Sequence, residues 1–156
     1  MDSTEYRIEV LSGSFESYGM VLDLLSRHPP FSDWPLSRLS RSVRLQLRQQ
    51  RQLGALSKTN DLIAYAGWTP TLQASAELWI EDRGPLKVLE RGHDAMAMTI
   101  VVSTQSAVTK ALMRRARELN PEMRWFFKRS YGRQLRDSRK TVLIDRARRG
   151  EDSSET

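Results

Sequence analysis

Apolar residues recur every three or four positions in two early segments of the chain, which is the period of a helix with one buried face. In residues 15–26 the repeating residues are Phe15, Tyr18, Val21, Leu22 and Leu25. In the next segment, which opens at Asp33 or Trp34 with Pro35 in the first turn, they are Leu36, Leu39, Val43 and Leu47. Two prolines at 29 and 30 separate the segments, because proline lacks an amide hydrogen and disfavours helix at the preceding residue. The pattern predicts two helices, the first capped by Ser14.

The segments that follow favour strands. Residues 52–57 and 62–69 are apolar and are joined by Lys-Thr-Asn-Asp, which is typical of a turn, so they predict an antiparallel hairpin. Residues 70–94 have no clear period, and a short helix near residues 74–81 is the favoured interpretation.

The rest of the chain predicts a strand, a helix and two more strands. The segments are residues 95–103, 106–120, 123–130 and 140–145. Helices at the start and strands in hairpins predict an α+β fold with one mostly antiparallel sheet. We expect a single domain over residues 1–147 and a disordered tail over residues 148–156.

Positive charge is clustered along the chain. The chain has 25 Lys and Arg against 19 Asp and Glu, and residues 110–150 hold fourteen of these cations against four acids. On the second predicted helix, Arg41, Arg44 and Arg48 form a stripe about a quarter to a third of a turn from the apolar stripe. Such clusters suggest an anionic partner, either an acidic protein or a nucleic acid, and an ordinary solvated surface is the alternative.

Composition excludes several classes of site. The absence of cysteine excludes disulfides, thiolate metal ligands and a cysteine nucleophile, and only two histidines are present, so we expect no metal. The longest apolar run is far below the roughly 18 residues that a membrane span needs. The first residues lack the basic and apolar segments of a signal peptide. We expect a cytoplasmic protein with no membrane span and no bound cofactor.

Two segments carry a resemblance to a known family. They are Leu-Leu-Ser-Arg-His-Pro-Pro-Phe-Ser-Asp-Trp-Pro at residues 24–35 and Leu-Ile-Ala-Tyr-Ala-Gly-Trp at residues 62–68. With the succession of strand, helix and two strands over residues 96–144, the chain resembles the RTX toxin-activating lysine acyltransferases over about residues 15–146. The resemblance implies a GNAT-like sheet flanked by helices. It also implies acyl carrier protein as acyl donor and a protein lysine as acceptor.

The family uses a histidine and an aspartate to handle the proton of the attacking amine. Counted back from Trp34, the histidine position falls at Phe31, and the aspartate position falls at or next to Thr99. A phenyl ring cannot accept a proton, and threonine is not a general base near neutral pH. The resemblance therefore implies that both catalytic positions are substituted.

Two nearby residues could replace the missing groups. His28 lies three residues before Phe31, and Asp94 lies five residues before Thr99, so His28, Asp94 and Thr99 are the candidate catalytic residues. The alternatives are that His28 is a polar residue ending a helix, where a partly charged imidazole is favourable, and that Asp94 is a loop residue.

The remaining candidates are binding residues. Arg41, Arg44, Arg48 and Arg129 are predicted to bind an acyl carrier protein or another anion, and Phe31, Trp34 and Trp68 to line a pocket or the core. Residues 125–133 interleave aromatic and cationic side chains, as single-strand nucleic-acid sites do, although a strand with Phe126 or Phe127 turned inward explains the same pattern.

The sequence leaves three functions open. The leading hypothesis is an acyltransferase-like protein, which is either an active enzyme or a catalytically degenerate binding protein on that fold. The alternative is a basic nucleic-acid-binding or regulatory protein of phage or mobile-element type. A structural role and a homodimer also stay open.

Overall fold

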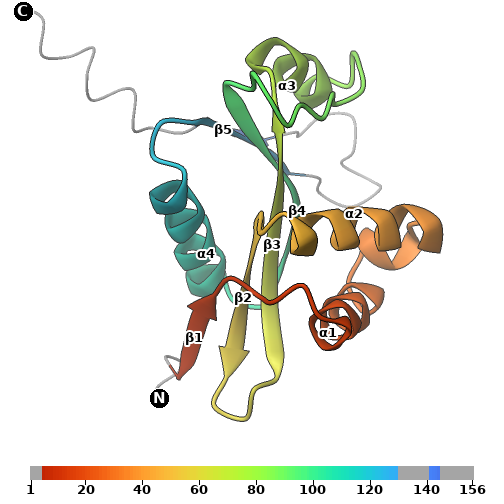
Figure 1. Cartoon of the computed structure of the whole chain (residues 1–156), viewed down its shortest axis with the longest axis vertical. Helices are drawn as coiled ribbons and strands as arrows, with labels where there is room; N and C mark the ends of the chain where they lie inside the picture. Colours follow the sequence, from red (N-terminus) through yellow and green to blue (C-terminus); the bar gives the residue numbers. More distant parts are fainter. Residues whose placement is uncertain (1–4, 130–140, 145–156) are drawn as a thin grey trace, which may run out of the picture. The chain divides into compact units, whose positions relative to one another are not determined.

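A computed structural model of the protein describes residues 5–129 and 141–144 (Figure 1). Its elements in chain order are β1 (Tyr6–Glu9), α1 (Phe15–Ser26), the short 3-10 helix η1 (Phe31–Asp33), α2 (Leu36–Arg48), β2 (Gln52–Ser57), β3 (Leu62–Thr71), α3 (Gln73–Ile80), β4 (Ala95–Ser103), α4 (Ser106–Leu119), β5 (Arg124–Arg129) and β6 (Thr141–Ile144). The predicted α+β class is confirmed, and the short helix in the middle of the chain is present. The predicted tail at residues 148–156 lies outside the described residues.

The strands are hydrogen-bonded in the order β1-β2-β3-β4-β5-β6. The pairs β1–β2, β2–β3 and β5–β6 are antiparallel, whereas β4 and β5 are parallel, with Ala95 opposite Arg124 and Met98 opposite Phe127. A parallel pair needs a crossover connection, which α4 supplies between β4 and β5. The sheet is therefore mixed and mostly antiparallel.

Residue contacts divide the chain into two compact units. The first contains Met1–Trp68 and Ile100–Leu119, and the second contains Thr69–Thr99 and Asn120–Thr156. The prediction of a single domain stays a prediction.

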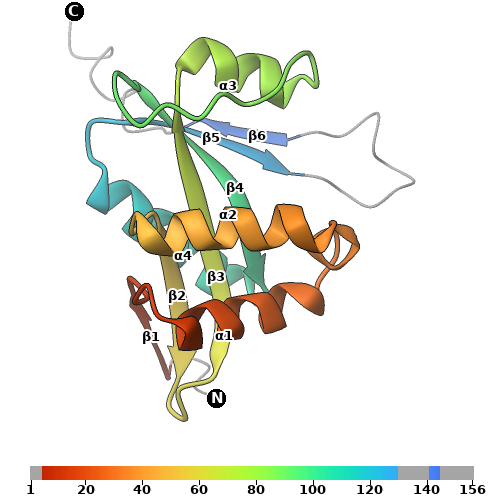
Figure 2. The ribbon, with the colours of Figure 1, turned by 45° about the vertical axis from the view of Figure 1, so that its right-hand side comes forward.

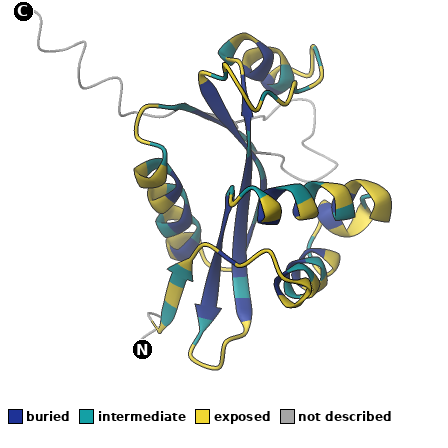
Figure 3. Cartoon of the chain, viewed as in Figure 1, coloured by how far each residue is buried: buried dark blue, intermediate teal, exposed yellow. Residues whose placement is uncertain are grey.

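In the first unit, helices cover both faces of the strands. The helices α1 and α2 pack side by side on one face, and α4 packs against β2 on the other (Figures 1 and 2). The fully buried centre of the α1–α2 side is formed by Val21, Leu25, Val43, Tyr65 and Ile100. Figure 3 shows these inner faces as buried and the outer turns of the helices as exposed.

Both predicted N-terminal helices form, with two differences at their first residues. Ser14 caps α1 as predicted, because its Oγ accepts the amide hydrogen of Ser17 at 3.2 Å. Phe15 and Leu36 belong to the apolar stripes, yet they are 88% and 72% exposed. Each is the first residue of its helix and lies beyond the buried part of that helix.

The second unit has a smaller core. Ala76 and Ile80 of α3 pack with Ala95 of β4 and Phe126 of β5. At the end of α3, Lys128 of β5 donates a hydrogen bond to the Trp79 carbonyl oxygen at 3.0 Å and forms an ion pair with Asp82. Partial burial lowers the pKa of the Lys128 ammonium, and these two acceptors hold the charge in place.

Candidate functional site

Phe31, at the position where the resemblance expects a histidine, lies in the apolar core of the first unit. It is 7% exposed and its ring meets the Trp34 ring edge-on, with 5.0 Å between the ring centroids and 72° between the planes. An edge-to-face aromatic pair is a favourable packing arrangement that needs no polar partner. The position therefore contributes packing and no proton acceptor.

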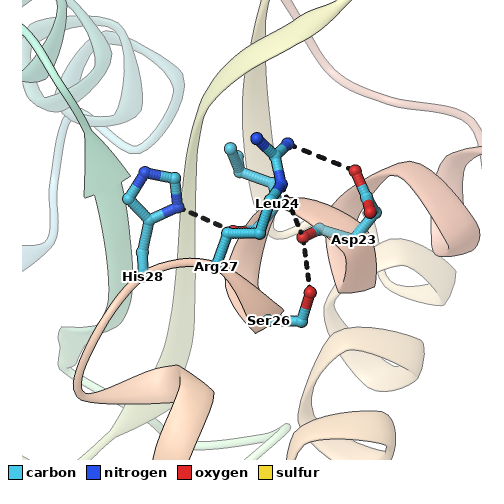
Figure 4. A network of polar contacts seen from close by, with 5 residues as sticks. All are labelled: Asp23, Leu24, Ser26, Arg27 and His28. Carbon is cyan, nitrogen blue, oxygen red and sulfur yellow. Dashed lines mark hydrogen bonds and ion pairs between the residues drawn. The ribbon is translucent and has the colours of Figure 1, made fainter.

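His28 lies directly after the C-cap of α1, where its ring is bonded to the end of the helix (Figure 4). Its Nδ1 lies 2.7 Å from the Leu24 carbonyl oxygen. A carbonyl oxygen can only accept, so Nδ1 carries the proton, and in a neutral ring the other nitrogen, Nε2, keeps its lone pair. The His28 amide also donates to the Leu25 carbonyl oxygen at 3.2 Å. These contacts fit a residue that satisfies the last carbonyl groups of a helix.

Asp94 has a similar role at the start of another helix. Its Oδ1 accepts the amide hydrogen of Gln73, the first residue of α3, at 2.8 Å, and its own amide donates to the Thr71 carbonyl oxygen at 3.2 Å. A carboxylate at a helix N-terminus satisfies an amide that has no partner within the helix. Asp94 therefore caps α3 from outside the helix.

The two positions that the resemblance assigns to catalysis, and the two residues that could replace them, divide between the two units. Phe31 and His28 belong to the first unit, and Asp94 and Thr99 to the second, where the Thr99 side chain on β4 is partly buried. The catalytic roles of His28, Asp94 and Thr99 stay predictions.

The aromatic candidates are mostly buried. Trp68 is 2% exposed on β3, and in the segment that resembles a nucleic-acid site Trp125 is 5% and Phe126 is 1% exposed. Buried rings cannot stack on bases, so these two aromatics are core residues. Trp34 is partly exposed and carries the guanidinium of Arg38 on its ring face, 3.7 Å from the centroid.

The predicted arginine stripe forms on α2. Arg41, Arg44 and Arg48 are exposed, whereas Leu39, Val43, Gln46 and Leu47 of the same helix are buried. Arg129 lies in β5 opposite Thr141, and its side chain lies outside the described residues.

Sequence reasoning missed the residues that order this stripe. Arg38 stacks on Trp34, and the guanidinium of Arg44 lies over the ring of Tyr18 from α1, 5.6 Å from its centroid. The sequence offered only the four-residue spacing of Trp34 and Arg38 as a signal for the first pair; Trp34 has an extended backbone and precedes α2, so this spacing is not that of a helical turn.

The Ser103 side chain forms hydrogen bonds with the backbone of the turn between β4 and α4. The Oγ of Ser103 accepts the amide hydrogen of Gln105 at 3.1 Å and donates to the Gln105 carbonyl oxygen at 2.9 Å. Strand-to-helix turns that hold phosphates present free amides, usually from glycines that allow close approach. No glycine lies between Val102 and Thr109, so this turn does not form such a cradle.

Two further features bear on possible ligands and location. Within the described part of the chain, no three His, Asp or Glu side chains are grouped so that they could hold a metal ion. Among the same residues, no helix is both long enough and apolar enough to cross a membrane.

Comparison with known proteins finds no match by sequence and finds structures that share the fold. No protein-family model matches the chain, and no curated protein matches it. Arylalkylamine N-acetyltransferase 2 of Aedes aegypti superposes with a TM-score of 0.53 at 13% identity, over 86% of this chain and 80% of that one. A GNAT-family protein of Desulfovibrio desulfuricans gives 0.51 at 14% identity, over 96% and 82%.

A third structure, the PaiA N-acetyltransferase of Thermoplasma acidophilum in complex with coenzyme A, gives a TM-score of 0.50 at 11% identity, over 83% of this chain and 82% of that one. Identities this low establish the shared fold alone. The chain has the fold of the GNAT N-acetyltransferases.

Proposed function

We propose that the chain is an acyltransferase-like binding protein, which keeps the GNAT fold, recognises an acyl carrier protein or another acidic protein, and no longer transfers an acyl group to lysine. The observation that carries this proposal is the place of Phe31, buried against Trp34 in an apolar core.

The chemistry explains why this residue matters. A lysine amine has an ordinary pKa near 10.4, so attack on a thioester needs a group that removes its proton. Phe31 cannot accept a proton, and Thr99 is a poor base. His28 and Asp94 are bonded to the ends of helices, which gives each a structural reason to be present.

The proposal does not involve coenzyme A. The Ser103 side chain takes the Gln105 amide in the β4–α4 turn, and the turn has no glycine, so these residues do not fit a pyrophosphate. A carrier protein presents its acyl group on a protein surface and depends on contacts between two proteins, for which the exposed arginines of α2 are suited.

An acyl-transfer assay tests the proposal. The chain is incubated with acyl carrier protein bearing a labelled fatty acid and with a lysine-rich acceptor protein, and complex formation and acceptor labelling are both measured. We expect a complex without labelling. Labelling that disappears in His28→Ala or Asp94→Asn would instead identify an active enzyme with a replaced dyad. Absence of any complex with an acidic protein would contradict the binding function.

A nucleic-acid-binding or regulatory function is the second candidate. Its support is that residues 110–150 hold ten more Lys and Arg than Asp and Glu. Three of these cations, Lys110, Arg114 and Arg115, are exposed on α4. Binding through phosphates weakens steeply as salt rises. Failure to bind a 20-nucleotide duplex or single strand at low salt would remove this candidate.

A further inference from the structure

The exposed side of α2 carries an unusual concentration of one charge. Arg38, Arg41, Arg44 and Arg48 lie along about 15 Å of helix, and the helix contains no acidic residue. None of the four forms an ion pair with a carboxylate among the described residues. Like charges three and four residues apart destabilise a helix. The arrangement therefore costs stability that an anionic partner would recover.

Two of these arginines are held in place before any partner binds. Arg38 stacks on Trp34, and Arg44 lies over the ring of Tyr18. The Tyr18 hydroxyl in turn shares a hydrogen bond with Ser40 of α2, which fixes the ring between the two helices. Side chains that are already ordered lose less conformational entropy on binding. The cations are thus prepared for contact.

An exposed aromatic residue lies on α1, the helix that packs along α2. Phe15 is 88% exposed and lies one turn before Tyr18 on the same side of α1, which packs along α2 (Figure 2). Protein interfaces are enriched in aromatic residues and arginine, and depleted of lysine. The exposed cations of α2 are all arginines, so the composition of this surface is that of a protein interface.

We propose that Phe15, Arg41, Arg44 and Arg48, here called the arginine surface, dock an acidic helix of a partner protein. The inference rests on the proposed function, which requires an acidic partner, and it deepens that function by naming the surface and the element it binds. Arg41, Arg44 and Arg48 span about 10 Å with helical spacing, so carboxylates at the same spacing on a neighbouring helix can meet them. Phe15 then packs on the apolar side of that helix.

The test uses the full chain with two probes. One is holo acyl carrier protein, and the other is a synthetic 20-residue helical peptide with glutamates at i, i+3 and i+7 and leucines on the adjacent face. Dissociation constants are measured by calorimetry at low and high salt. One variant combines Arg41→Glu with Arg48→Glu, and a second carries Phe15→Ala. The control for the first combines Lys110→Glu with Arg114→Glu on α4, on the opposite side of the strands, and the control for the second is Leu119→Ala.

We expect the double reversal on α2 to weaken binding about tenfold or more at low salt and to remove most of its salt dependence. Phe15→Ala should weaken binding at both salt concentrations, because it removes apolar contact area rather than charge. The two controls should stay within about twofold of the unchanged protein. Circular dichroism establishes that each variant is folded.

The outcomes separate the surface from the proposed function. If the carrier protein binds and the α2 reversal has no more effect than the α4 reversal, the arginine surface is wrong and the binding function stands. If only the peptide binds and the α2 reversal abolishes it, the surface stands and the carrier protein is not the partner. If neither probe binds, or if a 20-nucleotide DNA displaces the peptide from this surface, the inference is overturned.

Discussion

Replacing Gly67 with alanine should destabilise the first unit through a buried side chain on α2. A Cβ atom at Gly67 would lie 1.9 Å from Oε1, 2.4 Å from Cδ and 2.8 Å from Nε2 of Gln46. Gln46 is 3% exposed, and its Oε1 accepts the hydroxyl hydrogen of Tyr65 at 2.7 Å. Gly67 is itself paired with Gln52 in the sheet, so the Gln46 amide has to move.

The expected loss follows from the groups that this movement exposes or leaves without partners. Moving the amide breaks the hydrogen bond to Tyr65, whose hydroxyl is fully buried, and disturbs the Gln46 head group as well. Each buried polar group that loses its partner costs about 1–3 kcal/mol. We expect Gly67→Ala to lower the free energy of unfolding by about 2–5 kcal/mol.

A double-mutant cycle measures this by urea unfolding, followed by tryptophan fluorescence. Gln46→Ala alone should also destabilise the protein. In the double variant Gln46→Ala with Gly67→Ala no amide remains to collide with the new Cβ atom. The double variant should therefore lose at least about 1 kcal/mol less than the sum of the two single losses. The control is Gly19→Ala on the exposed side of α1, where nothing lies within 4 Å and alanine should stabilise the helix by about 0.5–1 kcal/mol. Additive losses in the cycle would refute the collision.

Three other variants test separate parts of the structure. Asp94→Ala removes the cap of α3 and should lower the free energy of unfolding by about 1 kcal/mol, whereas Asp94→Asn keeps an acceptor for the Gln73 amide and should lose less in the same urea assay. Burial raises the pKa of the Tyr65 hydroxyl far above its ordinary value near 10, so the unfolded chain loses this proton first. The contribution of this hydroxyl to the free energy of unfolding is fully present below about pH 10 and falls by about 1.4 kcal/mol per pH unit above it. In Tyr65→Phe the free energy of unfolding should therefore fall less steeply above about pH 10, and equal slopes in the two proteins would contradict this. Phe31→Ala should cost about 3–5 kcal/mol in urea unfolding because it empties a buried site, and a loss below 1 kcal/mol would show that the ring is not part of the core.

Local patterns predicted most of the fold because helices and hairpins are defined by residues close together in the sequence. The three-and-four period located α1 and α2, and Ser14 marked the first cap. The parallel pairing of β4 with β5 was not predicted, since it joins residues 29 positions apart, such as Ala95 and Arg124, and depends on the crossover of α4. The exposure of Phe15 was also missed. Periodicity shows which face of a helix a residue lies on, but it does not show how much of the length of that face is covered by the core.

The contacts of the candidate site residues were not predictable from the sequence. Counting from Trp34 places Phe31 at the position where the resemblance expects a histidine, and this stays a prediction. The His28 ring bonds to the Leu24 carbonyl oxygen, and this contact depends on how α1 ends. Asp94 caps Gln73, and this contact depends on how two segments 21 residues apart pack together. The structure therefore gives His28 and Asp94 a role at helix ends that the sequence did not specify for Asp94 and offered only as the alternative for His28.

Position 31 and the first arginine of α2 are connected through one aromatic ring. Phe31 packs edge-on against Trp34, and the Trp34 ring also carries the guanidinium of Arg38, at the start of α2. A phenyl ring at position 31 needs no hydrogen-bond partner in the core, whereas a buried imidazole would need one. Phe31 therefore offers no proton acceptor and, at the same time, supports the ring that orders the first arginine of the helix. Under the proposed function this arrangement is favourable, because position 31 then has to serve packing and not proton transfer, and these two roles place opposite demands on a residue.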